Sequence, residues 1–286
     1  MHILNLLQNT RGCLSFEVFP PKKADNFSTV EAAALEIAAL RPAFMSVTYG
    51  AGGATDSFTL ALARSIQQGC GVPALAHMTC CGVPRAEIGQ RLTDMRAAGI
   101  ENILALRGDL PQGYVSAPGA FRYAAELVRE IKAYGGFCVG AACYPEGHTE
   151  CRSAAQDRLY LKEKVDAGVD FLATQMFFDN GLLYKFLYQI RALGIAIPVI
   201  PGVMPVTNGA QIERICKLSG TSLPARFRAI LDKYGASPAA MHQAGILYAC
   251  EQIVDLLAAG IPAVHVYSMN KPAVAAAIRS NLRDIL

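Results

Sequence analysis

The sequence is poor in charge and has no block of basic residues. Of its 286 residues, 17% are charged, and 26 lysines and arginines against 23 aspartates and glutamates give a net charge of +3. Proteins that follow a phosphate backbone concentrate basic residues on one face, so we do not expect nucleic acid as a partner. The hydrophobic share is 52%, which is enough apolar material for a folded core.

We also expect neither a membrane-spanning segment nor a secretory leader. The longest charge-free stretch, residues 192–212, contains Pro198, Pro201 and Pro205, and therefore predicts a strand and a turn rather than a spanning helix. Residues 1–7 have no basic residue before their short apolar patch, and no small-residue cleavage pattern follows. We therefore expect a soluble, cytoplasmic protein without a membrane partner.

The nine cysteines include no Cys-x-x-Cys pair. An odd number without such pairs disfavours both a disulfide framework and a zinc knuckle. We expect most of the thiols to be buried as small hydrophobic side chains in a reducing compartment. His77 has no second histidine or carboxylate at metal-ligand spacing, so no metal site is predicted.

Short apolar runs alternate with longer amphipathic ones along the chain, which is typical of repeated strand-helix units around a parallel sheet. The expected strands are residues 13–19, 43–49, 73–80, 102–107, 138–144, 171–177, 198–203 and 263–268. The expected helices include residues 29–40, 58–68, 85–98, 120–134, 153–167 and 182–193, and many of them stop at a glycine in C-cap position.

The Gly-x-Gly-x-x-Gly turn that would indicate an open, doubly wound sheet is absent. No linker divides the chain, and its length is near the roughly 250 residues typical of a (β/α)8 barrel. We therefore predict an α/β fold, a single (β/α)8 TIM barrel over residues 1–286. An extra helix is expected at residues 224–233, before the last long helix at residues 239–259.

Glu17 is the sharpest catalytic candidate, because the active sites of such barrels are built at the C-terminal ends of the strands. Period-two alternation places its side chain on the face opposite Phe16 and Val18, either in the barrel or in the helix layer. Apolar neighbours would raise the pKa of the carboxyl toward the range of a general acid. The alternative is a structural glutamate paired with an arginine from another strand.

Other polar residues also fall at predicted strand ends. In Arg107-Gly108-Asp109 the glycine allows a ligand to approach the backbone closely, although an ordinary turn with a surface ion pair is the alternative. His77 could equally be a satisfied core histidine. Gln175 is a neutral amide that needs partners when buried, which a heterocycle could supply.

Several segments in this order resemble methylenetetrahydrofolate reductases. They are Ser15-Phe16-Glu17-Val18-Phe19-Pro20-Pro21-Lys22, Ser46-Val47-Thr48-Tyr49-Gly50-Ala51, Ala105-Leu106-Arg107-Gly108-Asp109-Leu110-Pro111, Tyr144-Pro145-Glu146-Gly147-His148 and Thr174-Gln175-Met176-Phe177-Phe178-Asp179. Further matches are Lys164-Val165-Asp166-Ala167-Gly168 and Pro201-Gly202-Val203-Met204-Pro205-Val206. Motifs in register over most of the chain are far more specific than any single one.

The resemblance implies a flavin-dependent barrel enzyme that passes a hydride from a reduced nicotinamide, NAD(P)H, to FAD and then to 5,10-methylenetetrahydrofolate, giving 5-methyltetrahydrofolate. It implies Glu17 as the general acid that helps open the five-membered ring of the folate, and Asp109 as a catalytic carboxylate near the flavin and the pterin. The implied cofactor contacts are Thr48, Tyr49, Ala51, His77, Arg107, Gly108, Asp109, Ala124, Tyr144, His148, Asp157 and Lys164. The implied folate contacts are Asp109, Gln175, Gln211 and Lys271.

Some positions depart from the family pattern. Tyr160 and Glu163 stand where bacterial members have an Asn and an Arg that help to hold FAD, and a Glu in place of an Arg reverses a charge. Ile215 stands in place of an aromatic residue that stacks on the ligand, and Lys271 in place of an arginine. We expect weaker retention of FAD than in closer matches.

Two rival functions remain open. A Schiff-base aldolase or other lyase needs a desolvated lysine near a strand end, but no lysine falls in an expected strand, and only Lys22, Lys23 and Lys271 lie near the rim. A non-catalytic barrel that serves as a subunit of a larger complex would not need Glu17 and Gln175 at the same end. No motif identifies the electron donor or the physiological direction of the reaction. The oligomeric state also stays open, and both a homo-oligomer and a complex with a partner subunit are compatible with the sequence.

Overall fold

The computed structural model describes residues 1–10, 12–49, 56–110 and 119–286. Parallel strands form one sheet: β1 (Cys13–Val18), β2 (Met45–Val47), β3 (Ala74–Thr79), β4 (Asn102–Leu106), β5 (Cys138–Cys143), β6 (Phe171–Thr174), β7 (Val199–Ile200), β8 (Gly202–Val203) and β9 (Ala263–Tyr267). Their order in the sheet is β7-β6-β5-β4-β3-β2-β1-β9-β8. Because β8 follows β7 directly in the chain, the sheet closes on itself.

The strands β7 and β8 are two halves of the strand expected at residues 198–203. Pro201 separates them, since it has no N–H to donate, and its carbonyl accepts a hydrogen bond from the backbone N–H of His265 at 2.8 Å. β7 pairs with β6, and β8 pairs with β9. The two halves together occupy one position of the ring, and the predicted (β/α)8 TIM barrel is confirmed.

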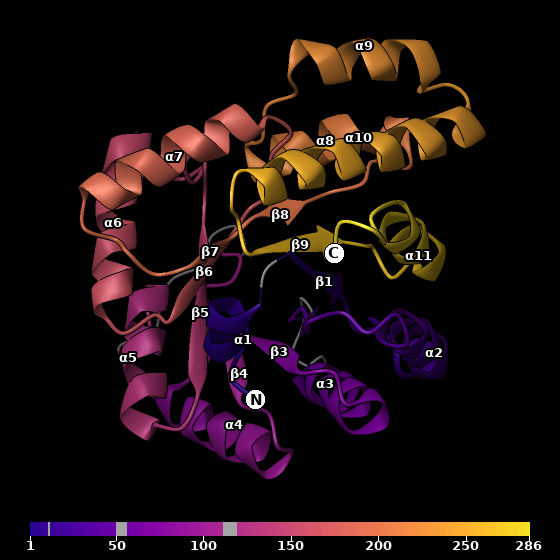
Figure 1. Ribbon diagram of the computed structural model, residues 1–286. Coiled ribbons are helices and arrows are strands. Elements are labelled where there is room, and N and C mark those ends of the chain that lie inside the picture. Colours follow the sequence, from indigo (N-terminus) through magenta and orange to yellow (C-terminus); the bar gives the residue numbers. More distant parts are fainter. Residues whose placement is uncertain (11, 50–55, 111–118) are drawn as a thin grey trace.

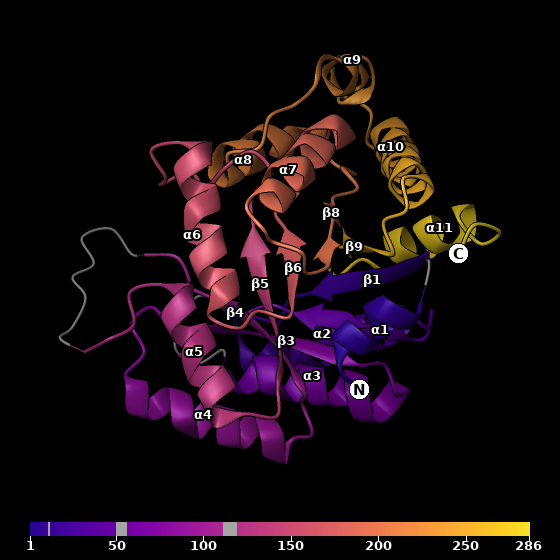
Figure 2. The same ribbon diagram turned by 60° about the vertical axis from the view of Figure 1, so that its left-hand side comes forward.

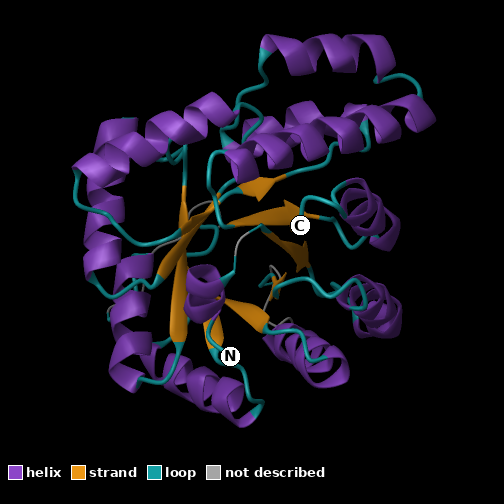
Figure 3. Cartoon of the chain, in the orientation of Figure 1, coloured by secondary structure: helices purple, strands orange, loops and turns teal. Residues whose placement is uncertain are grey.

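Helices surround the ring of strands (Figures 1 and 3). They are α2 (Phe27–Ala38), α3 (Asp56–Cys70), α4 (Arg85–Ala97), α5 (Ala124–Tyr134), α6 (Ala154–Asp166), α7 (Asn180–Ala192), α8 (Gly209–Ser219), α9 (Ala225–Tyr234), α10 (Pro238–Ala258) and α11 (Pro272–Asn281), with a short 3-10 turn η1 (Ala24–Asn26) before α2. The expected extra helix is α9, which lies beyond α10 on the side away from the barrel (Figures 1 and 2). In the described part of the chain no helix is long and apolar enough to cross a membrane.

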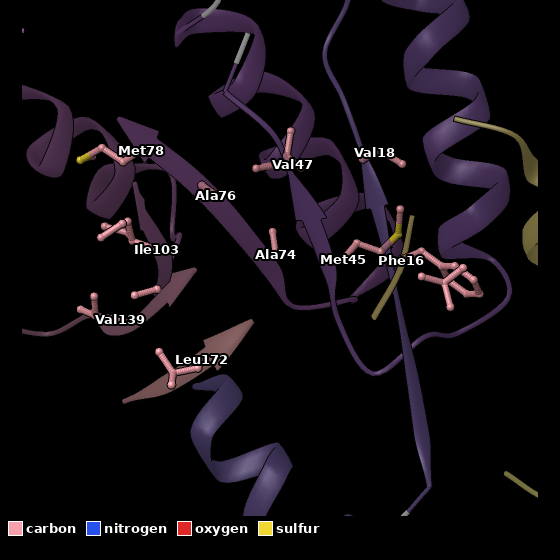
Figure 4. Close-up of a cluster of buried hydrophobic side chains, with 14 of the residues drawn as sticks. Phe16, Val18, Met45, Val47, Ala74, Ala76, Met78, Ile103, Val139 and Leu172 are labelled. Atoms are coloured by element: carbon pink, nitrogen blue, oxygen red, sulfur yellow. The ribbon is translucent and has the colours of Figure 1, made fainter. Parts of the chain in front are cut away.

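The main core lies between the strands and the outer helices. Alternate residues of β1 to β6 point outward into this layer, and Figure 4 shows some of them from neighbouring strands: Phe16, Val18, Met45, Val47, Ala74, Ala76, Met78, Ile103, Val139 and Leu172. The residues between them face the barrel interior, which is where the polar side chains of β1, β2, β3 and β9 lie. The nine cysteines are all free, as expected.

The helix α1 (Ile3–Asn9) was not among the expected elements. It covers the N-terminal end of the barrel, where Ile3 and Leu7 are buried in a cluster with Phe44, Leu75, Leu104, Cys138, Phe171, Ile200 and Ala263. The backbone N–H of Ile3 donates to Asn102 Oδ1 at 2.8 Å. This end of the barrel is therefore closed by an apolar floor.

Candidate active site

A cavity of about 230 Å³ lies inside the barrel above this floor. Its apolar base is shared with the cluster under α1, and its upper wall is polar. The residues of the upper wall come from the C-terminal halves of strands or directly follow them: Glu17, Ser46, Thr48, His77, Tyr144, Thr174, Gln175, His265 and Tyr267. The structure thus brings Glu17, Thr48, His77, Tyr144 and Gln175, all expected at the site, to one cavity.

Glu17 points into the barrel rather than into the helix layer. Its Oε2 accepts a hydrogen bond from Ser46 Oγ at 3.3 Å and lies 3.7 Å from His77 Nε2 and 3.8 Å from His265 Nε2. Its side chain keeps 21% of its surface exposed. Among the described residues the carboxylate meets a serine and two histidines, and not the arginine that the structural alternative required.

The expected rise in the pKa of Glu17 is wrong for the free protein. Burial is the largest influence and raises the pKa, but interactions with His265, His77 and Ser46 together outweigh it, and the pKa lies below the ordinary value of 4.5. The apolar neighbours in the sequence point away into the helix layer. The groups that decide the pKa come from other strands, so the local sequence does not reveal them.

His77 is buried beside Glu17. Its Nε2 has no hydrogen-bond partner among the described residues, so it is not the satisfied core histidine of the alternative reading. Burial lowers the pKa of its imidazole to about 4, against a smaller opposing influence of Glu17. At neutral pH the imidazole is therefore uncharged, and its Nε2 is available for a hydrogen bond to a ligand in the cavity.

Tyr267, the neighbour of Glu17 in the sheet, links this part of the wall to Thr174 on β6. The Tyr267 hydroxyl donates to the carbonyl of Thr174 at 2.6 Å, and Thr174 Oγ1 accepts from the N–H of Gly202 at 2.8 Å. A side chain at Gly202 would collide with the Tyr267 hydroxyl, so glycine is required there. Gln175 follows, with its Oε1 accepting from the N–H of Met176 at 2.9 Å.

For the turn after β4, the sequence left two interpretations open: a turn that a ligand approaches closely, and an ordinary turn with a surface ion pair. Arg107 forms a two-pronged ion pair with Glu150, with N–O distances of 2.6 and 2.7 Å. Gly108 has φ +89°, and a Cβ there would lie 3.1 Å from Thr79 Cβ, so this turn requires glycine. Asp109 is exposed at the end of the turn. Arg107 is therefore ion-paired, with Glu150 rather than with Asp109, and the side of Gly108 where a Cβ would stand is filled by Thr79 and Cys81.

The loop after β5 gathers several residues assigned to the flavin. The rings of Tyr144 and His148 meet edge to face with centroids 4.7 Å apart, and the N–H of His148 donates to Asp157 Oδ2 at 3.2 Å. Lys164 Nζ donates to the carbonyl of Ala142 at 2.5 Å. Burial raises the pKa of Asp157 and lowers that of Lys164, and both residues are half-buried.

Other expected cofactor contacts are near this rim or lie outside the described residues. The Tyr49 hydroxyl accepts from Arg91 Nη1 at 3.0 Å, and Ala124 is the first residue of α5. Ala51 lies outside the described residues. Arg91, which Tyr49 engages, was not singled out from the sequence.

Gln211 and Lys271 are exposed and do not line the described cavity. Gln211 lies in the first turn of α8, one turn before the half-buried Ile215. Lys271 Nζ donates to Thr207 Oγ1 at 3.0 Å. Tyr160 and Glu163 are exposed on α6. The structure does not test whether the exposed residues of this paragraph contact a ligand, so these contacts stay predictions.

Sequence reasoning missed His265, Ser46 and Ser15, which are buried inside the barrel next to Glu17. A usable signal was present, because His265 alternates with Tyr267 in an expected strand and therefore shares its face. Within the described ranges, no group of three or more His, Cys, Asp or Glu side chains could hold a metal ion.

Comparison with known proteins places this site in context. The chain matches the methylenetetrahydrofolate reductase family over residues 2–283. It is 35% identical to methylenetetrahydrofolate reductase (NADH) 1 of Zea mays, with 98% of this chain and 50% of the relative covered. It is 33% identical to 5,10-methylenetetrahydrofolate reductase of Pectobacterium carotovorum subsp. carotovorum, with 93% and 88% covered.

The chain spans about half the length of the plant relatives it matches. A solved structure of a Clostridium thermocellum protein, described as binding two copies of 5-methyl-5,6,7,8-tetrahydrofolic acid, shares the fold with a TM-score of 0.70 and 13% identity, over 100% of both chains. The sequence match over nearly the whole length, on a barrel with this polar rim, shows that the chain belongs to the methylenetetrahydrofolate reductase family.

Proposed function

We propose that this protein is an FAD-dependent oxidoreductase that reduces 5,10-methylenetetrahydrofolate to 5-methyltetrahydrofolate with electrons from a reduced nicotinamide. The observation that carries the proposal is the carboxyl of Glu17 on the inner wall of a barrel cavity, in a chain of this family. Bacterial relatives named 5,10-methylenetetrahydrofolate reductase are covered over 88% of their length. The plant relatives carry NADH in their names, so NADH is the first donor to test.

The residues present fit a flavin. His77 Nε2, which has no hydrogen-bond partner among the described residues, can bond to a polar heterocycle, and Gly108 at the rim is half-buried. Arg107 and Lys164 supply cationic groups, and Tyr49, Ala51, Ala124, Tyr144, His148 and Asp157 are the further proposed contacts. FAD would supply the two-electron chemistry, accepting a hydride from the nicotinamide and giving it to the folate.

The proposed task of Glu17 is to protonate a ring nitrogen of the folate, because the five-membered ring must open to an iminium before it can accept a hydride. In the free protein the carboxyl is ionised at neutral pH, since its pKa lies below the ordinary value. A folate ring that covers the cavity removes the exposed part of this side chain from water, and desolvation raises the pKa of a carboxyl. Substrate binding therefore favours the protonated acid where it is needed.

Asp109 and Gln175 would orient the folate. Gln175 lines the cavity, and an amide can donate to and accept from a pterin edge. Asp109 is exposed and can accept hydrogen bonds from a ligand at the rim. Thr48 lines the cavity and is the proposed contact of the nicotinamide.

The test separates the two half-reactions by stopped flow. We expect Glu17→Gln to leave flavin reduction by the nicotinamide near the wild-type rate, because that step opens no ring, and to slow folate reduction by about 10²–10⁴-fold. Glu31→Gln, on the outer helix α2, is the matched control and should leave both halves unchanged. Equal losses in both halves would show that Glu17 has a structural role only.

The rival functions have their own tests. None of the lysines lines the cavity, and borohydride trapping of a substrate adduct would be required to support a Schiff-base lyase. Turnover of the folate by the isolated chain excludes a non-catalytic barrel. A colourless protein that cannot be reconstituted with FAD would contradict the flavin assignment.

A further inference from the structure

A buried row of hydrogen bonds leads from Glu17 into the barrel wall. Ser46 Oγ lies 3.3 Å from Glu17 Oε2 and 3.0 Å from His265 Nε2. On the far side of the ring, His265 Nδ1 lies 2.7 Å from Ser15 Oγ, which lies 3.3 Å from the carbonyl oxygen of Val264. Ser15, Ser46 and His265 are all buried, so these groups satisfy one another rather than water.

The imidazole of His265 is held in one place. Its ring stacks on Phe44 with centroids 5.7 Å apart and an interplanar angle of 7°, and it meets Tyr267 edge to face at 5.6 Å. Both nitrogens are engaged by serines. Rotation of the ring would break these contacts, so the variable that remains is which nitrogen carries the hydrogen.

An ionised Glu17 requires one direction along the row. A carboxylate only accepts hydrogen bonds, so Ser46 donates its single hydrogen to Glu17 Oε2. Ser46 Oγ must then accept from His265, which fixes the hydrogen on Nε2 of the neutral ring. The bare Nδ1 accepts from the hydroxyl of Ser15. Every polar atom of the row is satisfied.

A protonated Glu17 allows the opposite direction. The carboxylic acid donates to Ser46 Oγ, Ser46 donates to His265 Nε2, and the ring carries its hydrogen on Nδ1. Nδ1–H donates to Ser15 Oγ, and the Ser15 hydroxyl turns to the carbonyl of Val264. The two arrangements are alternative equilibrium states that differ by one proton, which Glu17 takes from the cavity; the ring holds one hydrogen in both, on Nε2 in the first and on Nδ1 in the second.

We propose that Ser46 and His265 are positioning residues of Glu17, forming with Ser15 a hydrogen-bond relay that reverses direction when Glu17 gains or loses its proton. A partner that is hydrogen-bonded in both states lets the carboxyl change its charge without leaving a buried polar group unpaired, which would be unfavourable. The use of the relay in catalysis rests on the proposed function, whereas its existence does not.

The other titratable groups that face Glu17 do not offer this path. His77 Nε2 is 3.7 Å from the carboxylate and has no hydrogen-bond partner in the described part of the chain. The Tyr267 hydroxyl donates to the carbonyl of Thr174, and burial raises its pKa well above 10.0. His265 Nε2 is 3.8 Å from Glu17 Oε2, so the connection runs through Ser46.

The tautomer of His265 is the direct readout. The full chain labelled with ¹⁵N-histidine gives long-range proton-nitrogen spectra that distinguish Nε2–H, Nδ1–H and the doubly protonated ring. The sequence has 5 histidines, and a His265→Gln variant identifies the signal by its absence. At neutral pH we expect His265 in the wild type to carry its hydrogen on Nε2 alone.

Two variants release this constraint. Glu17→Gln replaces an acceptor by an amide that can also donate, and Ser46→Ala removes the connecting hydroxyl, so in both we expect a substantial population of Nδ1–H. Ser268→Ala is the matched control, since Ser268 Oγ donates at 2.9 Å to the backbone carbonyl of Glu17 and not to its carboxylate. That variant should keep the wild-type tautomer.

The proposal fails if wild-type His265 carries Nδ1–H, a mixture of tautomers or hydrogens on both nitrogens, or if Glu17→Gln and Ser46→Ala both retain Nε2–H alone. Retention in Ser46→Ala only would move the coupling to a direct contact and also overturn the relay. The spectra require neither flavin nor folate turnover. The absence of the relay would therefore not contradict the proposed folate reduction. Conversely, an inactive enzyme would not contradict the relay.

Discussion

Gly108→Ala probes the turn after β4, which we propose to contact FAD. Gly108 has φ +89°, a conformation that costs an L-residue about 1–2 kcal/mol. A Cβ would also lie 3.1 Å from Thr79 Cβ and 3.3 Å from Thr79 Cγ2. Because Thr79 Cβ is fixed to the backbone at the end of β3, rotation of that side chain cannot relieve the closer contact.

The two costs act together. Overpacking of this kind adds about 1–3 kcal/mol, so we expect Gly108→Ala to lower the free energy of unfolding by about 2–5 kcal/mol. A domain with a stability of about 10 kcal/mol, in the middle of the usual range, stays folded. The displaced turn carries Arg107 and Asp109, so we also expect FAD to bind at least about tenfold more weakly, which corresponds to about 1.4 kcal/mol.

Urea unfolding and flavin fluorescence titration measure the two effects. Gly260→Ala is the matched control, since Gly260 has φ +85° and no atom within 4 Å of an added Cβ. It should lose only about 1–2 kcal/mol and bind FAD normally. Thr79→Ser in the Gly108→Ala background removes the Cγ2 contact and should restore part of the loss. Wild-type FAD affinity in Gly108→Ala would refute the assignment of this turn to the cofactor.

Three further predictions concern the cavity and its rim. The pKa of His77 falls from 6.5 to about 4 in the fold, so the unfolded chain takes up this proton first, and stability that is complete above pH 6.5 is lost as the pH falls toward 4. The difference of about 2.5 in pKa corresponds to about 3 kcal/mol. Between pH 7 and pH 4 the free energy of unfolding, measured with urea, should therefore fall by about this much less in His77→Gln than in the wild type. Equal falls in the two proteins would contradict the prediction. Glu163→Arg should tighten FAD binding roughly two- to fivefold, as for an exposed charge, whereas Glu36→Arg on α2 should not; no change would mean that Glu163 points away from the phosphates. Ile215→Phe should lower the KM for the folate by a factor of about 2 to 12, which corresponds to about 0.5–1.5 kcal/mol of stacking energy. An unchanged KM would place this residue outside the site.

The repeated strand-helix pattern was sufficient to predict the barrel, because buried parallel strands read as apolar runs and the outer helices as amphipathic ones. The break at Pro201 and the helix α1 were not predicted. Pro201 looks like part of an apolar run until the pairing of β8 with β9 is known. The residues of α1 are too few for a clear helical period, and their burial depends on the open end of the barrel that they cover.

The sequence correctly predicted the cavity residues whose location follows from their position at the end of a strand. Glu17, Thr48, His77, Tyr144 and Gln175 occur at strand ends and do line the cavity. The charge state of Glu17 was predicted wrongly, because Ser46 and His265 reach it from strands that are distant in sequence. Contacts between distant strands follow from the closure of the barrel, which no local pattern contains.

The barrel interior changes from apolar to polar along its axis, and this change has a consequence for binding. Phe44, Leu75 and Phe171 form the dry floor below Glu17, and a low dielectric strengthens the hydrogen bonds above it. Within the polar layer Ser46 and His265 are hydrogen-bonded, whereas His77 Nε2 has no partner among the residues that the structure describes. A buried group without a partner costs about 1–3 kcal/mol, and a ligand that bonds to His77 recovers this energy on binding. In the described part of the chain, His77 Nε2 is therefore a position where a bound ligand would stabilise the protein.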